Sequence, residues 1–252
     1  MKTAVITGAS SGLGTEFLKV LAAKNEIEEY WIIARRADRL EKLKDIYKDK
    51  NIICIPADIT KDSGLDRYRK LLTERKPDIR YLINNAGCGR IGGFYGSDNS
   101  DQCAMVELNC RALTAITAMS LPYMKRGSGI LNVCSIAAFV PNPYMTVYSS
   151  TKAYIMSFSR SLRFELKELG INVLALCPGP MKTEFLPIAG IEKGVSQAFD
   201  RLPYCSPRSV AEGGISALEK GHAVYTPRLF YKFYRTLAKI LPHELLMHFS
   251  KV

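Results

Sequence analysis

Short runs of apolar and β-branched residues alternate with longer amphipathic segments along most of this chain. Runs of the first kind predict strands and segments of the second kind predict helices. The predicted strands lie at residues 3–7, 30–34, 51–57, 81–86, 129–135, 171–178 and 222–227, and the predicted helices start near Gly12, Asp38, Leu65, Ser100, Thr146 and Pro207. This alternation predicts an α/β fold, in which a doubly wound sheet of seven parallel strands is covered by helices on both faces.

Length and composition favour one domain, because 252 residues with 47% hydrophobic content can enclose a sizeable core. No window of transmembrane length lacks charges, and the first residues have the pattern of a strand, not of a signal peptide. We therefore expect a cytoplasmic protein. Neither the scattered cysteines nor His222, His243 and His248 have metal-ligand spacing, so we expect reduced thiols and no metal site.

The formal net charge of +11 raises the question of an anionic partner. Most basic residues alternate with acids, as in residues 35–50, which is typical of a solvated helix face. No nucleic-acid-binding motif accompanies them, so we expect no nucleic-acid partner. The exception is the C-terminal tail, where a single acid, Glu244, stands against Arg228, Lys232, Arg235, Lys239 and Lys251.

A glycine-rich turn follows the first predicted strand, with the spacing G-x-x-x-G-x-G formed by Gly8, Gly12 and Gly14. Glycines at a strand-to-helix turn let the backbone approach a pyrophosphate, which the helix N-terminus also attracts. A purely structural turn is the alternative. The position after the first strand of an α/β chain favours a nucleotide site.

The end of the second predicted strand indicates which dinucleotide binds. An acidic residue there suits the ribose hydroxyls of NAD(H), whereas arginine suits the 2′-phosphate of NADP(H). This chain has Arg35 and Arg36, and no acid before Asp38. We predict NADP(H), with Arg35 the preferred phosphate contact and NAD(H) as the less favoured cofactor; the alternative is two solvated arginines at the start of a charged helix.

Tyr148 and Lys152 are four residues apart in a segment with helical periodicity. This spacing places both side chains on one face of a helix. A phenol has an ordinary pKa of roughly 10. A neighbouring ammonium favours the phenolate, so we expect Lys152 to lower the pKa of Tyr148.

Several motifs in order along the chain resemble the short-chain dehydrogenase/reductase family, in its form of about 250 residues. The resemblance extends from Thr3 to about Thr226 and includes TGASSGLG, ADIT, NNAG, YSSTK and PGPMKT. It implies a Rossmann-type fold and a catalytic tetrad of Asn109, Ser135, Tyr148 and Lys152. By this resemblance Tyr148 donates or accepts the substrate proton, Ser135 binds the substrate oxygen, Lys152 also holds the nicotinamide ribose, and Asn109 positions a proton-relaying water.

The resemblance also implies the residues that bind the cofactor. They are Gly8, Ser10, Ser11, Leu13, Gly14, Arg35, Arg36, Asp58, Ile59, Asn84, Ala86, Gly87, Tyr148, Lys152, Pro178, Gly179, Met181 and Thr183. The chain departs from some NADP-preferring members, which often carry a basic residue where this chain has Ser11. The NADP(H) prediction therefore depends on the two arginines.

Three segments beyond the strand ends are candidates for the substrate site, namely residues 88–96, 136–145 and 184–204. The third carries Phe185, Leu186, Ile188, Ile191, Phe199, Leu202 and Tyr204. Apolar walls suit a hydrophobic secondary alcohol or ketone, with a hydroxysteroid or bile acid favoured. The alternatives are a reductase of lipid or quinone carbonyls, a non-catalytic NADP(H)-binding sensor or scaffold, and side chains that pack on the core.

We predict a catalytic domain over residues 1–227 and a helical extension over 228–252. Lys232, Arg235 and Lys239 follow one face of an amphipathic helix that breaks near Pro242. The resemblance implies a tail at the substrate entrance or at a subunit contact, and a homodimer or homotetramer. Weak contact with a membrane surface is the alternative role for the tail.

Overall fold

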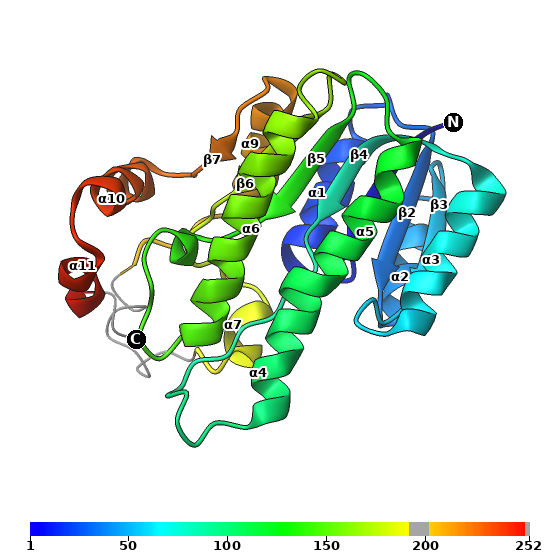
Figure 1. The fold of residues 1–252 in the computed structure, drawn as a ribbon. Coiled ribbons are helices and arrows are strands. Elements are labelled where there is room, and N and C mark those ends of the chain that lie inside the picture. The colour runs from blue at the N-terminus through cyan, green and yellow to red at the C-terminus, as the bar shows by residue number, and fades with distance from the viewer. Residues whose placement is uncertain (192–201, 250–252) are drawn as a thin grey trace.

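The computed structural model describes residues 1–191 and 202–249. Its parallel strands pair in the order β3-β2-β1-β4-β5-β6-β7, which confirms the predicted doubly wound sheet (Figure 1). The strands are β1 (Lys2–Thr7), β2 (Glu29–Ala34), β3 (Asn51–Pro56), β4 (Asp78–Asn84), β5 (Gly129–Val133), β6 (Asn172–Leu176) and β7 (Val224–Tyr225).

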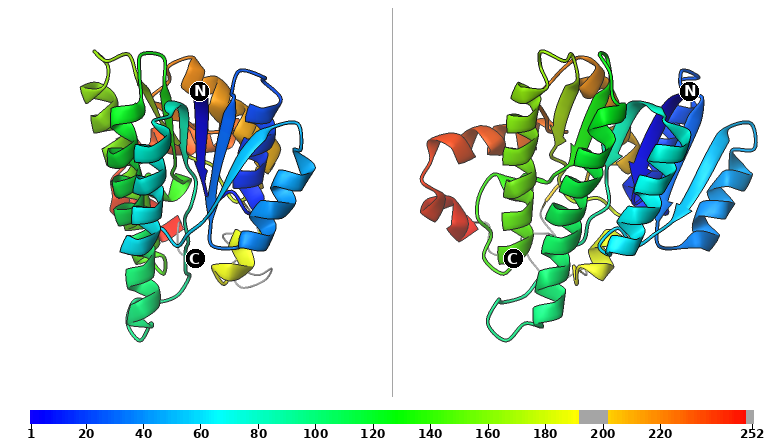
Figure 2. Two further views of the ribbon diagram at one scale, coloured as in Figure 1. Left: turned by 90° about the vertical axis from the view of Figure 1, so that its right-hand side faces the viewer. Right: turned by 45° about the vertical axis from the view of Figure 1, so that its right-hand side comes forward.

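Helices connect successive strands and cover both faces of the sheet, as two further views show (Figure 2). They are α1 (Gly12–Ala22), α2 (Ala37–Ile46), α3 (Asp62–Arg75), α4 (Asn99–Val106), α5 (Leu113–Ser120), α6 (Thr146–Glu165), α7 (Phe185–Ile188), α9 (Pro207–Glu219), α10 (Leu229–Ile240) and α11 (His243–Phe249). A π-helical turn, η1 (Glu107–Ala112), joins α4 to α5, and short 3-10 helices lie at η2 (Leu121–Tyr123) and η3 (Ile136–Ala138).

The central strands are buried on both faces, which is why they read as continuous apolar runs. In β1, Ile6 packs into the cluster that contains residues of α1, α2 and α9. Its neighbour Val5 points the other way, into the cluster that contains residues of α3 and α6. Alternation of side chains along a strand thus builds two apolar layers around one sheet.

The strand order reverses beside β1, since β2 pairs with one edge of β1 and β4 pairs with the other. In doubly wound sheets the crevice at such a reversal, beyond the carboxyl ends of the strands, is the usual place of a nucleotide. The glycine-rich turn after β1 and the segments after β4, β5 and β6 all reach this end.

The tail forms two helices, and the predicted break near Pro242 is confirmed: α10 ends at Ile240 and α11 begins at His243. Figure 1 shows both helices beyond β7, on the side of the molecule where α6 lies. Ala238 and Leu246 are buried against Val140, so the tail is packed onto the segment that follows β5. Within residues 1–191 and 202–249, no helix is long and apolar enough to cross a membrane.

Candidate active site

One large cavity lies at the carboxyl ends of the strands and has a volume of about 1260 Å³. Its wall includes the glycine-rich turn and residues of α6, α7, α10 and α11. Pockets for a single drug-sized ligand usually measure roughly 300–1,000 Å³. The volume therefore accommodates a dinucleotide and part of a second molecule.

The turn after β1 adopts a conformation that favours glycine. Gly8 has φ +66°, and its N–H donates to the Ile33 carbonyl at 2.8 Å. Gly14 is needed for a different reason, because a Cβ there would stand 2.2 Å from the Gly8 carbonyl oxygen. The side-chain amide of Asn85 donates to the carbonyls of Thr7 and Gly8 at 3.0 and 3.1 Å and braces the turn from β4.

Most of the predicted cofactor residues line this cavity. They are Gly8, Ser10, Ser11, Leu13, Arg35, Arg36, Asp58, Ile59, Ala86, Gly87, Tyr148, Lys152, Pro178, Gly179, Met181 and Thr183. The wall thus combines a glycine-rich backbone, two arginines and a carboxylate. These donors and acceptors fit an adenine dinucleotide. Contact of each residue with a cofactor remains a prediction.

Two predicted cofactor residues, Gly14 and Asn84, do not line the cavity. Gly14 packs against the backbone of the turn without facing the cavity. The Asn84 amide is buried and donates to Oγ1 of Thr117 at 2.9 Å and to Oδ1 of Asn132 at 2.8 Å. Its geometry supports a structural role that ties β4 to β5 and α5, and Asn85 is the neighbouring asparagine that reaches the cavity wall.

Asp58 follows β3 and keeps a charged carboxylate in the cavity wall. It accepts hydrogen bonds from the backbone N and Oγ1 of Thr60 at 3.0 and 2.7 Å. Burial alone raises the pKa of Asp58, but the Thr60 hydrogen bonds and the charge of Arg35 outweigh burial and hold this pKa below its ordinary value. Asp58 is thus available as a hydrogen-bond acceptor.

Arg36 lies over the glycine-rich turn, since its Nη2 donates to Oγ of Ser10 at 3.1 Å and to Oγ of Ser11 at 2.9 Å. Its Nη1 pairs with the carboxylate of Glu184, which precedes α7, at 2.9 Å. Arg36 therefore links the glycine-rich turn to the segment before α7.

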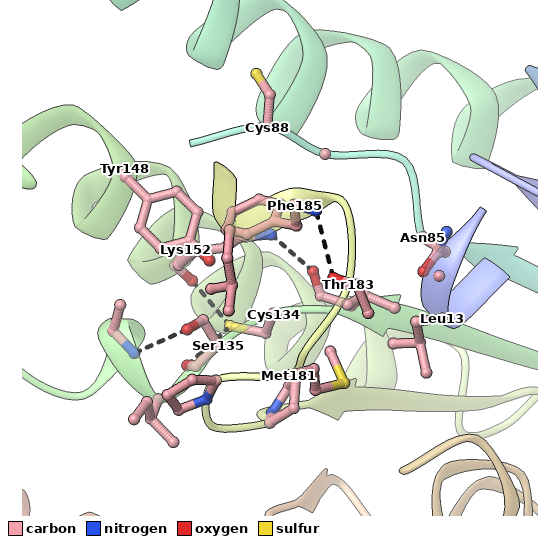
Figure 3. Close-up of a pocket in the computed structure, with 18 of the residues that line it drawn as sticks. Leu13, Asn85, Cys88, Cys134, Ser135, Tyr148, Lys152, Met181, Thr183 and Phe185 are labelled. Carbon is pink, nitrogen blue, oxygen red and sulfur yellow. Dashed lines mark hydrogen bonds between the residues drawn. The ribbon is translucent and has the colours of Figure 1, made fainter. Parts of the chain in front are cut away.

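The predicted catalytic side chains converge from different elements: Tyr148 and Lys152 from α6, and Ser135 just after β5 (Figure 3). Tyr148 is only 8% exposed, and its ring centroid lies 5.9 Å from that of Phe185 in α7. Ser135 begins the 3-10 turn η3, where its Oγ accepts from the backbone N of Ala137 at 3.1 Å. Tyr148, Ser135 and Lys152 all line the cavity.

The electrostatics of Tyr148 differ from the prediction. Burial raises its pKa above the ordinary value of a phenol, and a hydrogen bond with Ser135 offsets only part of that rise. Lys152 lies with Nζ 5.6 Å from the Tyr148 ring centroid and donates to the Val133 carbonyl at 3.0 Å. The prediction of a lowered pKa for Tyr148 is wrong for the residues of the chain by themselves, because burial raises this pKa by more than the hydrogen bond with Ser135 lowers it.

Lys152 and Asn109 flank Gly87. Lys152 is 4% exposed, and burial lowers its pKa. Asn109 lies in the π-helical turn η1, and its amide bonds the backbone N and O of Cys88 and Oγ1 of Thr151 at 2.9–3.0 Å. A Cβ on Gly87 would stand 3.1 Å from Oδ1 of Asn109 and 3.5 Å from Nζ of Lys152, so glycine leaves space between them. Asn109 itself stands behind the cavity wall.

Comparison with known proteins identifies a family for this chain. A family model described as short chain dehydrogenase matches residues 2–189. The chain belongs to the short-chain dehydrogenase/reductase family. Membership makes it an oxidoreductase with a nicotinamide cofactor.

Individual relatives of this short-chain dehydrogenase/reductase are distant in sequence. The sulfoacetaldehyde reductase of Chromohalobacter salexigens is 34% identical over 205 residues, which is 78% of this chain and 79% of that protein. A short-chain dehydrogenase from Sphingobium yanoikuyae, solved in complex with NADPH, has a TM-score of 0.83 and 27% identity, covering 98% of this chain and 96% of that one. The bulky-bulky ketone specific alcohol dehydrogenase from Comamonas testosteroni has a TM-score of 0.77 and 26% identity, covering 98% and 94%.

Sequence reasoning missed some wall residues of this short-chain dehydrogenase/reductase. The cavity is also lined by four residues of the tail, Tyr234, Leu237, Leu241 and Leu246. Phe185, one of the residues predicted from segment 184–204, lines it as well. Phe199, predicted in the same segment, lies outside the described residues. Glu184 received no role from the sequence, since an isolated carboxylate gives no signal until its arginine partners are known.

Proposed function

We propose that the protein is an NADP(H)-dependent oxidoreductase that interconverts a hydrophobic secondary alcohol and its ketone, with a hydroxysteroid or bile acid as the favoured substrate. The observation that carries this proposal is the continuity of one cavity from the Ser135–Tyr148 pair to apolar side chains of α7 and the tail. A carbonyl oxygen at that pair has two hydroxyl groups beside it, and the carbon skeleton has an apolar chamber beyond it.

The residues that would hold the cofactor follow the cavity wall. The turn from Gly8 to Leu13 would hold the pyrophosphate, and Arg35 and Arg36 would hold the 2′-phosphate. Asp58 would bind the adenosine and Lys152 the nicotinamide ribose, and all of these residues line the cavity. When bound, the nicotinamide supplies or accepts the hydride.

The side chains supply the remaining chemistry. Reduction of a ketone places negative charge on its oxygen, and a positioned proton donor stabilises that charge. Because its pKa is raised, Tyr148 carries a proton at neutral pH and donates it to the substrate oxygen. Ser135 donates a hydrogen bond to the same oxygen and fixes its distance from Tyr148.

Lys152 and Asn109 support the pair formed by Tyr148 and Ser135. The buried ammonium of Lys152 stabilises the phenolate that remains after Tyr148 has given up its proton. Asn109 lies beside Gly87. It positions a water that relays protons from Lys152 toward solvent.

The test is formation of reduced nicotinamide from NADP or NAD with hydroxysteroids, bile acids, retinol and long-chain secondary alcohols. Turnover of one substrate class with NADP supports the proposal. A parallel assay follows the oxidation of NADPH with quinones and lipid carbonyls. Turnover in that assay alone supports the alternative of a lipid or quinone reductase. Tight NADPH binding without turnover of any of these substrates supports a non-catalytic sensor.

We propose that residues 1–227 form the catalytic domain and that the tail closes the substrate entrance, with residues 228–252 as its extension. Tyr234, Leu237 and Leu241 line the cavity from α10, while Leu246 does so from α11. A homodimer or homotetramer, cytoplasmic localisation and weak contact between the tail and a membrane surface remain proposals from the sequence.

A further inference from the structure

The carboxylate of Glu184 links the segment before α7 to the residues that follow β2. Oε2 of Glu184 lies 2.9 Å from Nη1 of Arg36, and Oε1 lies 2.5 Å from Nη1 of Arg39. Hydrogen bonds from Arg39 and Arg36 lower the pKa of Glu184 to about 2, so it is charged at neutral pH. The ion-pair cluster of Arg36, Arg39 and Glu184 is therefore held by one carboxylate between two guanidinium groups.

This cluster connects the segment after β6 to the end of β2. The residue before Glu184, Thr183, stands over the glycine-rich turn, with its Cβ 3.3 Å from where a Cβ on Gly12 would be. The residue after it, Phe185, packs on the Tyr148 ring. Glu184 thus sits between a residue beside the phosphate turn and a residue beside the catalytic tyrosine.

Each nitrogen of the Arg36 guanidinium already donates at least one hydrogen bond, and Nε, like Nη2, bonds Ser10. Nη1 bonds Glu184, and Nη2 bonds both Ser10 and Ser11. A phosphate that reaches this guanidinium must replace one of these acceptors or share the cation with it. The two hydroxyls are neutral, whereas Glu184 carries a charge of the same sign as the phosphate, so Glu184 is the acceptor that opposes a phosphate.

We propose that Glu184 is a specificity-determining residue, whose carboxylate competes with the 2′-phosphate of NADP(H) for Arg36 and so weakens the preference for NADP(H) over NAD(H). The inference deepens the proposed function and rests on its assignment of the arginines to the 2′-phosphate. NAD(H) lacks the 2′-phosphate, so Glu184 does not oppose its binding by this route.

Loss of the carboxylate does not free Arg36 to swing away. Ser10 and Ser11 still accept from its Nη2, at 3.1 and 2.9 Å. Removal of the charge therefore leaves the guanidinium over the turn while it removes the competing anion.

The test measures binding of NADPH and of NADH to the full-length protein by calorimetric titration, for the unmodified chain and for Glu184→Gln. We expect the dissociation constant of NADPH to fall about two- to fivefold and that of NADH to stay unchanged, on the scale of a partly exposed ion pair. High salt should shrink the gain, because it screens exposed charges.

The matched control is Glu212→Gln. Glu212 is also a partly exposed carboxylate paired with an arginine, Arg208, at 2.9 Å, but it lies in α9 and outside the cavity wall. Its substitution should change neither dissociation constant. In an Arg36→Ala background, Glu184→Gln should give no gain in NADPH affinity.

The outcomes separate this inference from the proposed function. NADPH binding that is unchanged or weaker in Glu184→Gln overturns the inference, even where Arg36→Ala confirms that Arg36 binds the 2′-phosphate. An unmodified chain that prefers NADH, but shifts toward NADPH in Glu184→Gln, supports the inference and contradicts the proposed NADP(H) preference.

Discussion

Gly179, in the loop after β6, is covered by the ring of Tyr231 in α10. A Cβ on Gly179 would stand 2.2 Å from the nearest atom of that ring. Tyr231 is fully buried, and its hydroxyl donates to the Pro203 carbonyl at 2.7 Å. The tail is therefore anchored directly on the loop that forms part of the cofactor cavity wall.

We expect Gly179→Ala to lower the free energy of unfolding by about 1–3 kcal/mol, the usual cost of an extra group in a filled space. Thermal and urea denaturation measure it. Gly93→Ala is the control, because a Cβ there would meet its nearest atom at an ordinary 3.8 Å. Equal stability of Gly179→Ala and the unmodified chain would show that the ring is not held against the loop.

Substitution Tyr148→Phe removes the phenolic hydroxyl but keeps the ring that packs on Phe185. We expect kcat to fall by about 10²–10⁴-fold, which is the usual contribution of a positioned proton donor. The dissociation constant of NADPH should change little. Steady-state kinetics and calorimetric titration check both values, and turnover near that of the unmodified chain would contradict the assignment of Tyr148.

The raised pKa of Tyr148 predicts opposite pH dependences for the two directions. The protonated phenol is the form required for reduction, so the reduction rate should stay level up to the ordinary phenol pKa of roughly 10. Oxidation requires the phenolate, so the oxidation rate should rise about tenfold per pH unit at pH values up to that ordinary pKa. Initial rates across pH test this, and an oxidation rate that levels off near neutrality would show that the bound cofactor lowers this pKa.

The outward face of α10 exposes Leu229, Phe233 and Ile240 beside Lys232 and Lys239. If the tail touches a membrane, the full-length protein should sediment weakly with vesicles that contain anionic lipid, and less so at high salt. Phe233→Glu should reduce the sedimented fraction. No sedimentation with either neutral or anionic vesicles would count against the contact and leave a subunit interface as the role of this face.

Local patterns in the sequence determined the fold class and named most of the candidate site residues. Apolar and β-branched runs predicted the strands. The glycine spacing after β1 predicted the phosphate turn, and the four-residue spacing of Tyr148 and Lys152 predicted the reactive pair. These features depend on neighbours within a few residues, which is why they can be read along the chain.

The tertiary structure decided what depends on residues far apart. The contact of Tyr231 with Gly179, the ion pairs of Glu184 with Arg36 and Arg39, and the inward bonding of Asn84 all join separate elements. The pKa of Tyr148 belongs with them, since burial raises it by more than the hydrogen bond with Ser135 lowers it. Burial and long-range charge pairing are properties of the packed molecule, whereas periodicity and motif spacing are properties of the chain.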